Sequence, residues 1–264
     1  MAAGTGLARS APKLEGRLSA RLRRDRVTLG DGAQTTVHVA AFDGRRTQIK
    51  VACLREPQRL AVWCAARGVS HALVGGFFTR PAGEPLGELR TAGIARGHVA
   101  FDAPWGEVRA CVHVVAGRPR IARRTELPRL PTGDLLQAGP LLVCDGRRAI
   151  EDGEDPEGFA AGARQFDSDI TAGRYPRAAL ALAGQRILAV AVDGRSDEDA
   201  GLTLAELADL LVELGADAAI NLDGGGSTSL VCGGRLRNRP RAQDDVELPM
   251  GRPIATALVF EPRY

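Results

Sequence analysis

Two aspartates and a run of small polar residues carry the strongest chemical signal in this sequence. Asp193 follows the apolar segment "RILAVAV", and Asp223 follows the apolar segment "AAINL" and opens the run "DGGGSTS". Two carboxylates held about 5 to 10 Å apart are typical of glycosidases. Asn221 precedes Asp223 by two residues, so a strand would turn both side chains to the same side. The pattern indicates a hydrolytic site built on carboxylates.

The three glycines after Asp223 have a second possible purpose. Gly224, Gly225 and Gly226 permit positive φ and carry no Cβ, so we expect their N–H groups to form an anion-binding nest. Ser227 and Thr228, followed by a further serine, would add hydroxyl donors at its rim. The alternative is a tight turn that uses the glycines for geometry alone. The polar neighbours favour a site.

The elements that must position these residues are predicted by the flanking pattern. The segment "GLTLAELADLLVELGA", residues 201–216, has an apolar face at helical spacing. Thr203 and Glu206 form a capping box at its start, and Gly215 suits a left-handed cap at its end. The sequence therefore predicts a helix between the two apolar segments.

Strand, helix and strand in succession predict a βαβ crossover near the C-terminus. Such a unit usually places its two strands parallel and in one sheet. Asp193 and Asp223 would then both emerge at carboxyl ends, where α/β sheets commonly bind ligands. We expect this unit to carry the site.

Other motifs are weak. A nucleophile elbow needs G-x-S-x-G, but the segment from Gly225 ends in Ser229, and the lysine of a nucleotide-binding loop is missing. The four histidines are dispersed, without the spacing of metal ligands. We therefore expect no metal and no cofactor, and interpret the histidines as structural or surface residues.

The rest of the chain predicts one domain after a short lead-in. Residues 1–26 are rich in Ala, Gly, Arg and Ser, and we expect a flexible basic lead-in, with structure beginning near Val27 and a single domain over 27–264. Alternating segments around "DGRR" predict a β-hairpin across residues 43–46. The segment "RLAVWCAARG" has helical spacing that ends at Gly68.

Composition excludes several classes of protein. Hydrophobic residues make up 44% of the chain with 7 Phe, 2 Trp and 2 Tyr, so the core must be mainly aliphatic. A net charge of +3 and an arginine-dense start without aromatics give no case for nucleic-acid binding. The 5 cysteines are widely spaced and are interpreted as reduced thiols. With no signal peptide and no membrane-spanning run, we expect a cytoplasmic protein.

A wider set of blocks resembles the phosphodiester glycosidase family. The run "AINLDGGGSTSLV" is preceded by "ALVGGFFTR", "QAGPLLVCDG", "PRAALAL" and "AVAVDGR" and followed by "GRPIATALVF", over roughly residues 70–262. The resemblance implies an α+β fold with a mixed, curved sheet flanked by helices. It also implies hydrolysis of a sugar-1-phosphodiester to free sugar and a phosphomonoester.

The resemblance also assigns candidate roles. Asp223 is the expected nucleophile or base, with Asp193 as its partner or as the residue that orients an arginine; Asp193 could alternatively be a turn aspartate. Arg177 and Arg195 suit bidentate contacts to phosphate, although both could be surface ion pairs. The remaining candidates for substrate binding are Asn221, Gly224, Gly225, Gly226, Ser227, Thr228, Gly75 and Gly76, the last two of which could instead belong to a strand packed under a helix.

Two departures from the family pattern leave alternatives open. Val74 stands where the family usually has asparagine, and Ala178 where threonine is common. The loss of an amide and a hydroxyl favours a binding module that recognises a phosphorylated glycan or nucleotide sugar without cleaving it. A third hypothesis is a phosphodiesterase that cuts P–O. The expected partner is a small-molecule or glycan sugar phosphate, with no nucleic acid and no membrane span.

Overall fold

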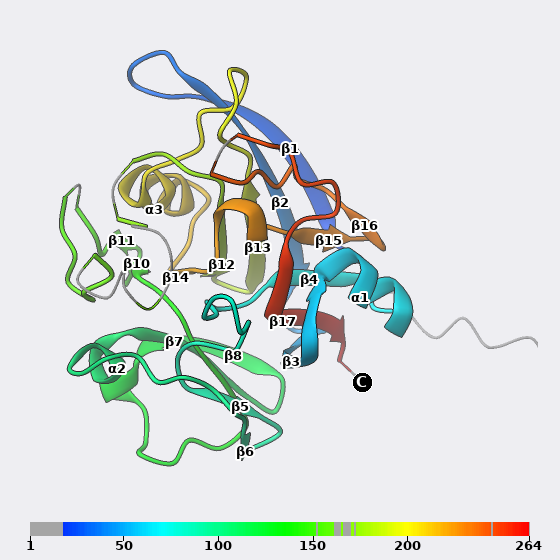
Figure 1. Ribbon diagram of the computed structural model, residues 1–264, viewed down its shortest axis with the longest axis vertical. Helices are drawn as coiled ribbons and strands as arrows, with labels where there is room; N and C mark the ends of the chain where they lie inside the picture. The colour runs from blue at the N-terminus through cyan, green and yellow to red at the C-terminus, as the bar shows by residue number, and fades with distance from the viewer. Residues whose placement is uncertain are drawn as a thin grey trace, which may run out of the picture.

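The computed structural model describes residues 18–263, apart from 152, 161–164, 166–169, 172 and 244. These residues form an α+β fold of three antiparallel sheets with few helices (Figure 1). The helices are α1 (Leu60–Arg67), α2 (Trp105–Val108) and α3 (Leu204–Glu213), with 3-10 turns at Arg124–Glu126 and Gly225–Ser227. None of the described helices is long and apolar enough to cross a membrane.

The largest sheet has seven strands and holds the elements predicted to carry the site. Its spatial order is β1 (Arg21–Thr28), β2 (Gln34–Asp43), β13 (Arg186–Val192), β12 (Arg177–Ala183), β14 (Ala218–Asn221), β10 (Leu141–Cys144) and β11 (Arg147–Arg148).

Two five-stranded sheets complete the fold. The second sheet has the order β16 (Arg235–Leu236), β15 (Leu230–Cys232), β4 (His71–Val74), β17 (Pro253–Pro262) and β3 (Thr47–Arg59). The third has the order β6 (Ile94–Ala95), β5 (Leu89–Thr91), β9 (Asp134–Gln137), β7 (Ala110–Val115) and β8 (Arg118–Arg123).

The expectation of a mixed sheet is wrong for the described strands of the large sheet, because every neighbouring pair is antiparallel. β13 and β14, the two strands joined through α3, do run in the same direction, since each pairs antiparallel with β12. The crossover therefore skips one strand position. A βαβ pattern in sequence gives the direction of its strands but not what lies between them.

The core lies on both faces of the large sheet, because its central strands β12, β13 and β14 are apolar at all but one terminal position each. In β13, Ile187 and Ala189 contact the core shared with the second sheet, whereas Leu188 and Val190 contact the core under α3. This alternation follows the two-residue period of a strand. α3 thus covers one face of the sheet, and the second sheet covers the other.

The predicted helix ends are confirmed. α1 ends at Gly68, which has φ 65° in the left-handed region. α3 begins with the capping box, in which the Thr203 hydroxyl accepts from the Glu206 N–H and the Glu206 carboxylate accepts from the Thr203 N–H. Gly215 follows the helix at φ 82°.

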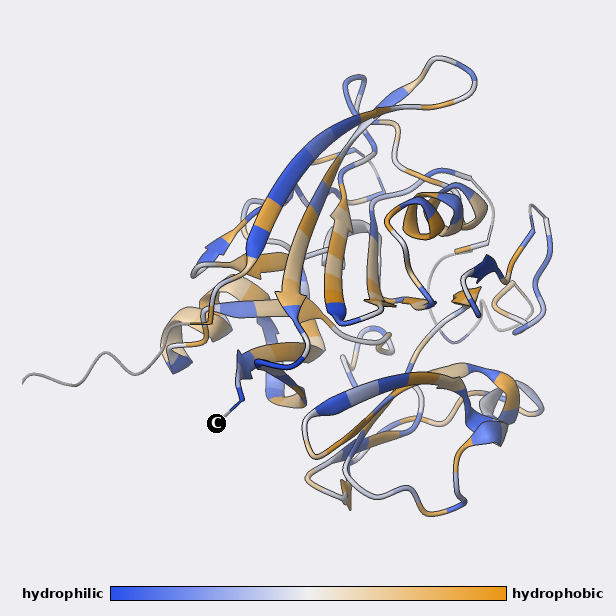
Figure 2. Cartoon of the chain, turned by 180° about the vertical axis from the view of Figure 1, so that it is seen from behind, coloured by the Kyte–Doolittle hydropathy of each residue, from blue (hydrophilic) through white to orange (hydrophobic). Residues whose placement is uncertain are grey.

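Regular structure begins earlier than expected. β1 starts at Arg21, inside the segment 1–26 predicted as a lead-in, and pairs with β2 along its whole length; residues 1–17 lie outside the described part. Figure 2 shows β1 as a largely hydrophilic strand beside the more apolar β2. Charged side chains suit a strand at the edge of a sheet, so the arginines that suggested a lead-in belong to an edge strand.

The hairpin predicted across residues 43–46 is also wrong. The turn exists, but β2 pairs with β13 in the large sheet while β3 pairs with β17 in the second sheet. The Gly44 N–H donates to the Gln185 carbonyl at 2.7 Å, which ties the turn to the β12–β13 connection. Alternation predicted both strands, but it does not specify their partners.

Candidate active site

A pocket opens at the edge of the large sheet where β13 and β14 end and β12 begins. The loop after β4 and the residue before β17 complete its wall, so the large and second sheets both contribute to it. Among the predicted site residues, the pocket is lined by Arg177, Arg195, Asn221, Asp223, Gly224, Gly225 and Gly226. The structure therefore brings together most of the residues that the sequence indicated.

Asp223 lies in this pocket in a largely desolvated position. Its Oδ1 accepts from the Gly224 N–H at 2.9 Å, and its own N–H donates to the Gly75 carbonyl at 3.0 Å. Its Oδ2 is buried and makes no hydrogen bond of normal geometry within the described residues. The backbone is thus fixed, while one carboxyl oxygen is left for a ligand.

Burial raises the pKa of the Asp223 carboxyl to about 7, because the charged form loses hydration. The nearby Ser227 hydroxyl, the Gly224 N–H and the Arg80 guanidinium lower the pKa by smaller amounts. Near neutral pH the carboxyl is therefore close to half ionised. A carboxylate in this state can accept a proton or attack an electrophile.

Two of the three N–H groups in the glycine run bond within the protein, so they do not contribute to the predicted anion nest. Gly224 donates to Asp223, and Gly225 donates to the Pro176 carbonyl at 2.9 Å. Of the three glycines, Gly225 alone has a positive φ, 58°. A Cβ on Gly224 would lie 2.8 Å from the Pro176 oxygen. These glycines allow close packing of the loop under the pocket.

The hydroxyls that follow lie beneath the loop rather than at its rim. Ser227 and Thr228 are 1% and 0% exposed and do not line the pocket. The reason is that β15 begins directly afterwards, at Leu230, and draws the chain into the second sheet. Neither hydroxyl makes a hydrogen bond of normal geometry to another described residue, although the Ser227 hydroxyl lies close enough to Asp223 to lower its pKa.

Asn221 lines the pocket from the end of β14. Its amide Nδ2 donates to the Gly139 carbonyl at 3.0 Å, while its buried Oδ1 makes no hydrogen bond to a described residue. An unsatisfied buried acceptor is costly unless a donor reaches it. A sugar hydroxyl entering the pocket is a group that could supply that donor.

The two predicted arginines differ in how they are held. Arg177 is buried, and its guanidinium donates to the backbone carbonyls of Ile170, Gly173 and Leu202 at 2.9 to 3.1 Å. Arg195 is partly exposed and donates to the Arg241 carbonyl at 3.3 Å. Arg177 therefore braces the backbone around the pocket, whereas Arg195 is better placed to bind a ligand.

Arg195 occupies unusual backbone geometry. Its φ is 59°, in the left-handed region that costs a non-glycine residue roughly 1 kcal/mol. Its guanidinium carbon lies 5.0 Å from the Tyr175 ring centroid, and that of Arg177 lies 5.2 Å from the same ring. The ring thus contacts both guanidinium groups at the wall of the pocket.

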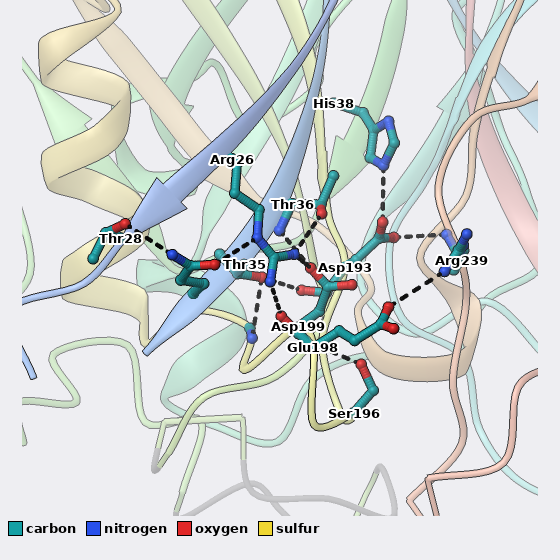
Figure 3. A network of polar contacts seen from close by, with 12 residues as sticks. Arg26, Thr28, Thr35, Thr36, His38, Asp193, Ser196, Glu198, Asp199 and Arg239 are labelled. Atoms are coloured by element: carbon teal, nitrogen blue, oxygen red, sulfur yellow. Dashed lines mark hydrogen bonds and ion pairs between the residues drawn. The ribbon is translucent and has the colours of Figure 1, made fainter. Parts of the chain in front are cut away.

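Asp193 lies at the same sheet edge but does not line the pocket. Because β12 separates β13 from β14, the two aspartates follow strands about 10 Å apart. The Asp193 carboxylate is buried and accepts from the Arg239 N–H at 2.6 Å and contacts His38 Nε2 at 2.9 Å (Figure 3). Its position is that of a residue that orients the loop carrying Arg195.

Gly75 and Gly76 shape the pocket without lining it. They follow the end of β4, and their N–H groups donate to the carbonyl and the hydroxyl of Thr256 at 2.9 and 3.0 Å. A Cβ on Gly75 would lie 2.4 Å from the Thr256 hydroxyl oxygen. The two glycines thus hold the following segment, whose Phe77 reaches the pocket.

Arg80, Tyr175 and Arg252 are among the residues of the pocket wall that sequence reasoning missed. Arg80 ends the "GGFFTR" block and Arg252 is the second residue of "GRPIATALVF", so both stood in segments already noted. The Arg252 N–H donates to the Gly226 carbonyl at 2.8 Å. The described lining residues include four arginines and one carboxylate. This excess of positive charge favours an anionic ligand.

No three His, Cys, Asp or Glu side chains in the described part of the chain lie close enough together to hold a metal ion. The pocket chemistry visible here is that of guanidinium groups, amide groups and a carboxyl.

Comparison with known proteins adds a family to this geometry. Residues 67–261 match the family model of phosphodiester glycosidases. The chain belongs to the phosphodiester glycosidase family. No curated protein matches the chain.

Solved structures show the same fold at low sequence identity. The zebrafish N-acetylglucosamine-1-phosphodiester α-N-acetylglucosaminidase catalytic domain, auto-inhibited by its pro-peptide, is 20% identical with a TM-score of 0.70, over 97% of this chain and 87% of that one. A protein of Synechocystis described as hypothetical is 20% identical with a TM-score of 0.61, over 92% and 62%. A Burkholderia pseudomallei K96243 protein described as exported is 17% identical with a TM-score of 0.57, over 88% and 74%.

The two departures from the phosphodiester glycosidase pattern lie in the core. Val74 and Ala178 are both 0% exposed and pack in the cluster between the large and second sheets. Neither lines the pocket. Both side chains pack in the core. The two substitutions therefore do not remove ligand-binding groups from the pocket wall, and they give no support to the non-catalytic binding module.

Proposed function

We propose that the protein hydrolyses the glycosidic C–O bond of a sugar-1-phosphodiester and releases a free sugar and a phosphomonoester. The observation that carries this proposal is the position of Asp223, with its pKa near 7, in a pocket lined by arginines. A carboxylate that ionises near neutrality can act on the anomeric carbon or on water, and guanidinium groups can bind a phosphate. Family membership supports the same reaction class.

The phosphate leaving group explains why the proposed reaction needs arginines in the pocket. When the C1–O bond breaks, its electron pair passes to a phosphate oxygen, and the departing phosphomonoester is a stable anion. Arg195 and Arg252, which line the pocket, would bind that anion through charge-assisted hydrogen bonds. Asp223 would either accept a proton from the attacking water or attack C1 itself to form an ester that water then hydrolyses.

Sugar recognition would fall to the floor of the pocket. The unsatisfied Oδ1 of Asn221 can accept a hydrogen bond from a sugar hydroxyl, and Tyr175 and Phe77 offer apolar contact. Asp193 is proposed as an orienting residue rather than as the second carboxylate of the reaction, because it points away into the contact with His38.

Turnover of a panel of sugar-1-phosphodiesters in water enriched in heavy oxygen tests the proposal. C–O cleavage places the label in the free sugar, whereas P–O cleavage places it in the phosphate. Asp223→Asn should abolish turnover while the protein stays folded. Asp209→Asn, a change at an exposed aspartate on α3, is the matched control and should turn over normally.

Three outcomes would refute the proposal. Label in the phosphate would indicate a phosphodiesterase. Full activity in Asp223→Asn would exclude that carboxylate from the reaction. Binding of a sugar phosphate without turnover of any member of the panel would indicate the binding module.

A further inference from the structure

The buried Asp193 joins three segments that are distant in sequence. One carboxylate oxygen contacts His38 Nε2 on β2 at 2.9 Å, and the other accepts from the Arg239 N–H at 2.6 Å (Figure 3). The backbone is tied as well, since the Asp193 N–H donates to the Thr36 carbonyl at 2.9 Å and its carbonyl accepts from the Thr35 hydroxyl at 2.7 Å. His38 and Asp193 are 4% and 3% exposed, so the contact is buried.

The contact between His38 and Asp193 is connected to Arg195 along the backbone. Gly194 separates the two residues, and a Cβ there would lie 2.8 Å from the Pro176 nitrogen and 2.9 Å from the Gly201 Cα. Arg195 then takes its left-handed φ of 59°. Because the link is short and closely packed, a shift of Asp193 would move Arg195 with it.

The contact between His38 and Asp193 is also connected to Arg195 through residues 239–241. Arg239, whose N–H bonds to Asp193, lies two residues before Arg241, and the Arg241 carbonyl accepts from the Arg195 guanidinium at 3.3 Å. Asp193 therefore fixes both the backbone that carries Arg195 and the segment whose carbonyl accepts from the Arg195 guanidinium.

We propose that His38 is a positioning residue that, through Asp193, holds Arg195 in the orientation that binds the substrate phosphate. The inference rests on the proposed function in one respect, that Arg195 is a phosphate ligand. If the contact between His38 and Asp193 served stability alone, its loss would lower stability but leave the phosphate affinity of the folded protein unchanged.

Binding of inorganic phosphate, measured by titration calorimetry on the full chain, tests this role without any need for turnover. His38→Leu removes the nitrogen that faces Asp193 and should weaken phosphate binding by about tenfold or more, since Asp193 loses a buried partner. His38→Gln can keep a nitrogen donor near the position of Nε2 and should bind phosphate within about threefold of the unmodified protein.

Asp199→Asn is the matched control. Asp199 also ties the loop after β13 to β2, through the Thr36 N–H at 2.7 Å, and to β1, through the Arg26 guanidinium at 2.6 Å (Figure 3). Within the described part of the chain, its side chain makes no hydrogen bond to Asp193 or Arg239. It should lose thermal stability without losing phosphate affinity. An equal loss of affinity in Asp199→Asn and His38→Leu would overturn the inference.

A double-mutant cycle supplies the sharper test. If His38 acts through Arg195, then Arg195→Gln should weaken phosphate binding and His38→Leu should add little to that loss. Additive losses would show that His38 acts on phosphate by another route, and unchanged binding in His38→Leu would also overturn the inference. If the unmodified protein binds no phosphate, the inference fails; if it binds phosphate with the expected pattern but turns over no substrate, only the proposed function fails.

Discussion

Replacement of Asp223 by asparagine should stabilise the protein at alkaline pH while it removes activity. Burial raises the pKa of this carboxyl from 3.8 to about 7, so the folded state binds its proton more tightly than the unfolded state does. Below pH 3.8 the carboxyl is protonated in both states and contributes no difference. As pH rises through the interval up to about 7, the unfolded chain releases the proton first, and the folded state loses stability.

The magnitude follows from the size of the shift. A difference of about 3 pKa units corresponds to roughly 4 kcal/mol, and since the residue keeps some exposure to the pocket we expect about 2 to 4 kcal/mol. Asparagine has the shape of the protonated acid and keeps an oxygen for the Gly224 N–H. Asp223→Asn should therefore unfold at a Tm roughly 5 to 10 °C higher at pH 8, with a difference near zero at pH 4.

Thermal unfolding at pH 4, 6 and 8, at one scan rate, measures this effect. Asp209→Asn serves as the control, because it removes only an exposed ion pair with Arg148, whose contribution should be about 1 kcal/mol or less at every pH. Equal or lower stability of Asp223→Asn at pH 8, or a difference that does not shrink toward pH 4, would show that the carboxyl is not desolvated as the structure indicates.

Other predictions concern the pocket and its supports. As base or nucleophile, Asp223 must be ionised, so kcat/KM should rise with pH through about 7 and at pH 5 reach only about 1% of its plateau; a flat profile from pH 5 to 7 would contradict this role. Arg252→Gln should weaken inorganic phosphate binding about tenfold with little change in Tm, as calorimetry and thermal unfolding would show. Gly225→Ala should cost about 1 kcal/mol of stability, because φ is 58° and the new Cβ would lie 3.0 Å from an Arg195 nitrogen; urea unfolding measures it. Thr203→Ala removes the capping box and should cost about 1 kcal/mol with kcat/KM unchanged within about twofold.

The part of the site that local sequence predicts is the part built by one segment. Asn221 ends a short apolar strand and Asp223 follows it. The glycines after them indicate a sharp turn, so the place of both residues at the end of a strand was visible in the sequence. Arg80 and Arg252 reach the same pocket from the second sheet. Their arrival depends on how the two sheets pack, which no local pattern specifies.

The position of Asp193 shows a different limit. The βαβ pattern correctly indicated strands that run in the same direction, yet β12 lies between them. The residues of β12 precede the unit in sequence, and their long-range pairing decides the distance between the two aspartates. In the same way, the arginines of β1 lie on an edge strand that pairs with β2. The sequence of β1 alone does not predict that pairing.

Pairing of the second sheet bears on when the pocket can form during synthesis. β17 pairs with β3 and β4, and its Thr256 holds both glycines after β4, one of which accepts from the Asp223 N–H. Asp223 is translated well before Thr256, so its loop lacks this support while the chain is still being made. A nascent chain that has emerged from the ribosome only as far as β15 would contain every predicted site residue and yet have no ordered pocket. Activity should therefore appear only after β17 has emerged and paired.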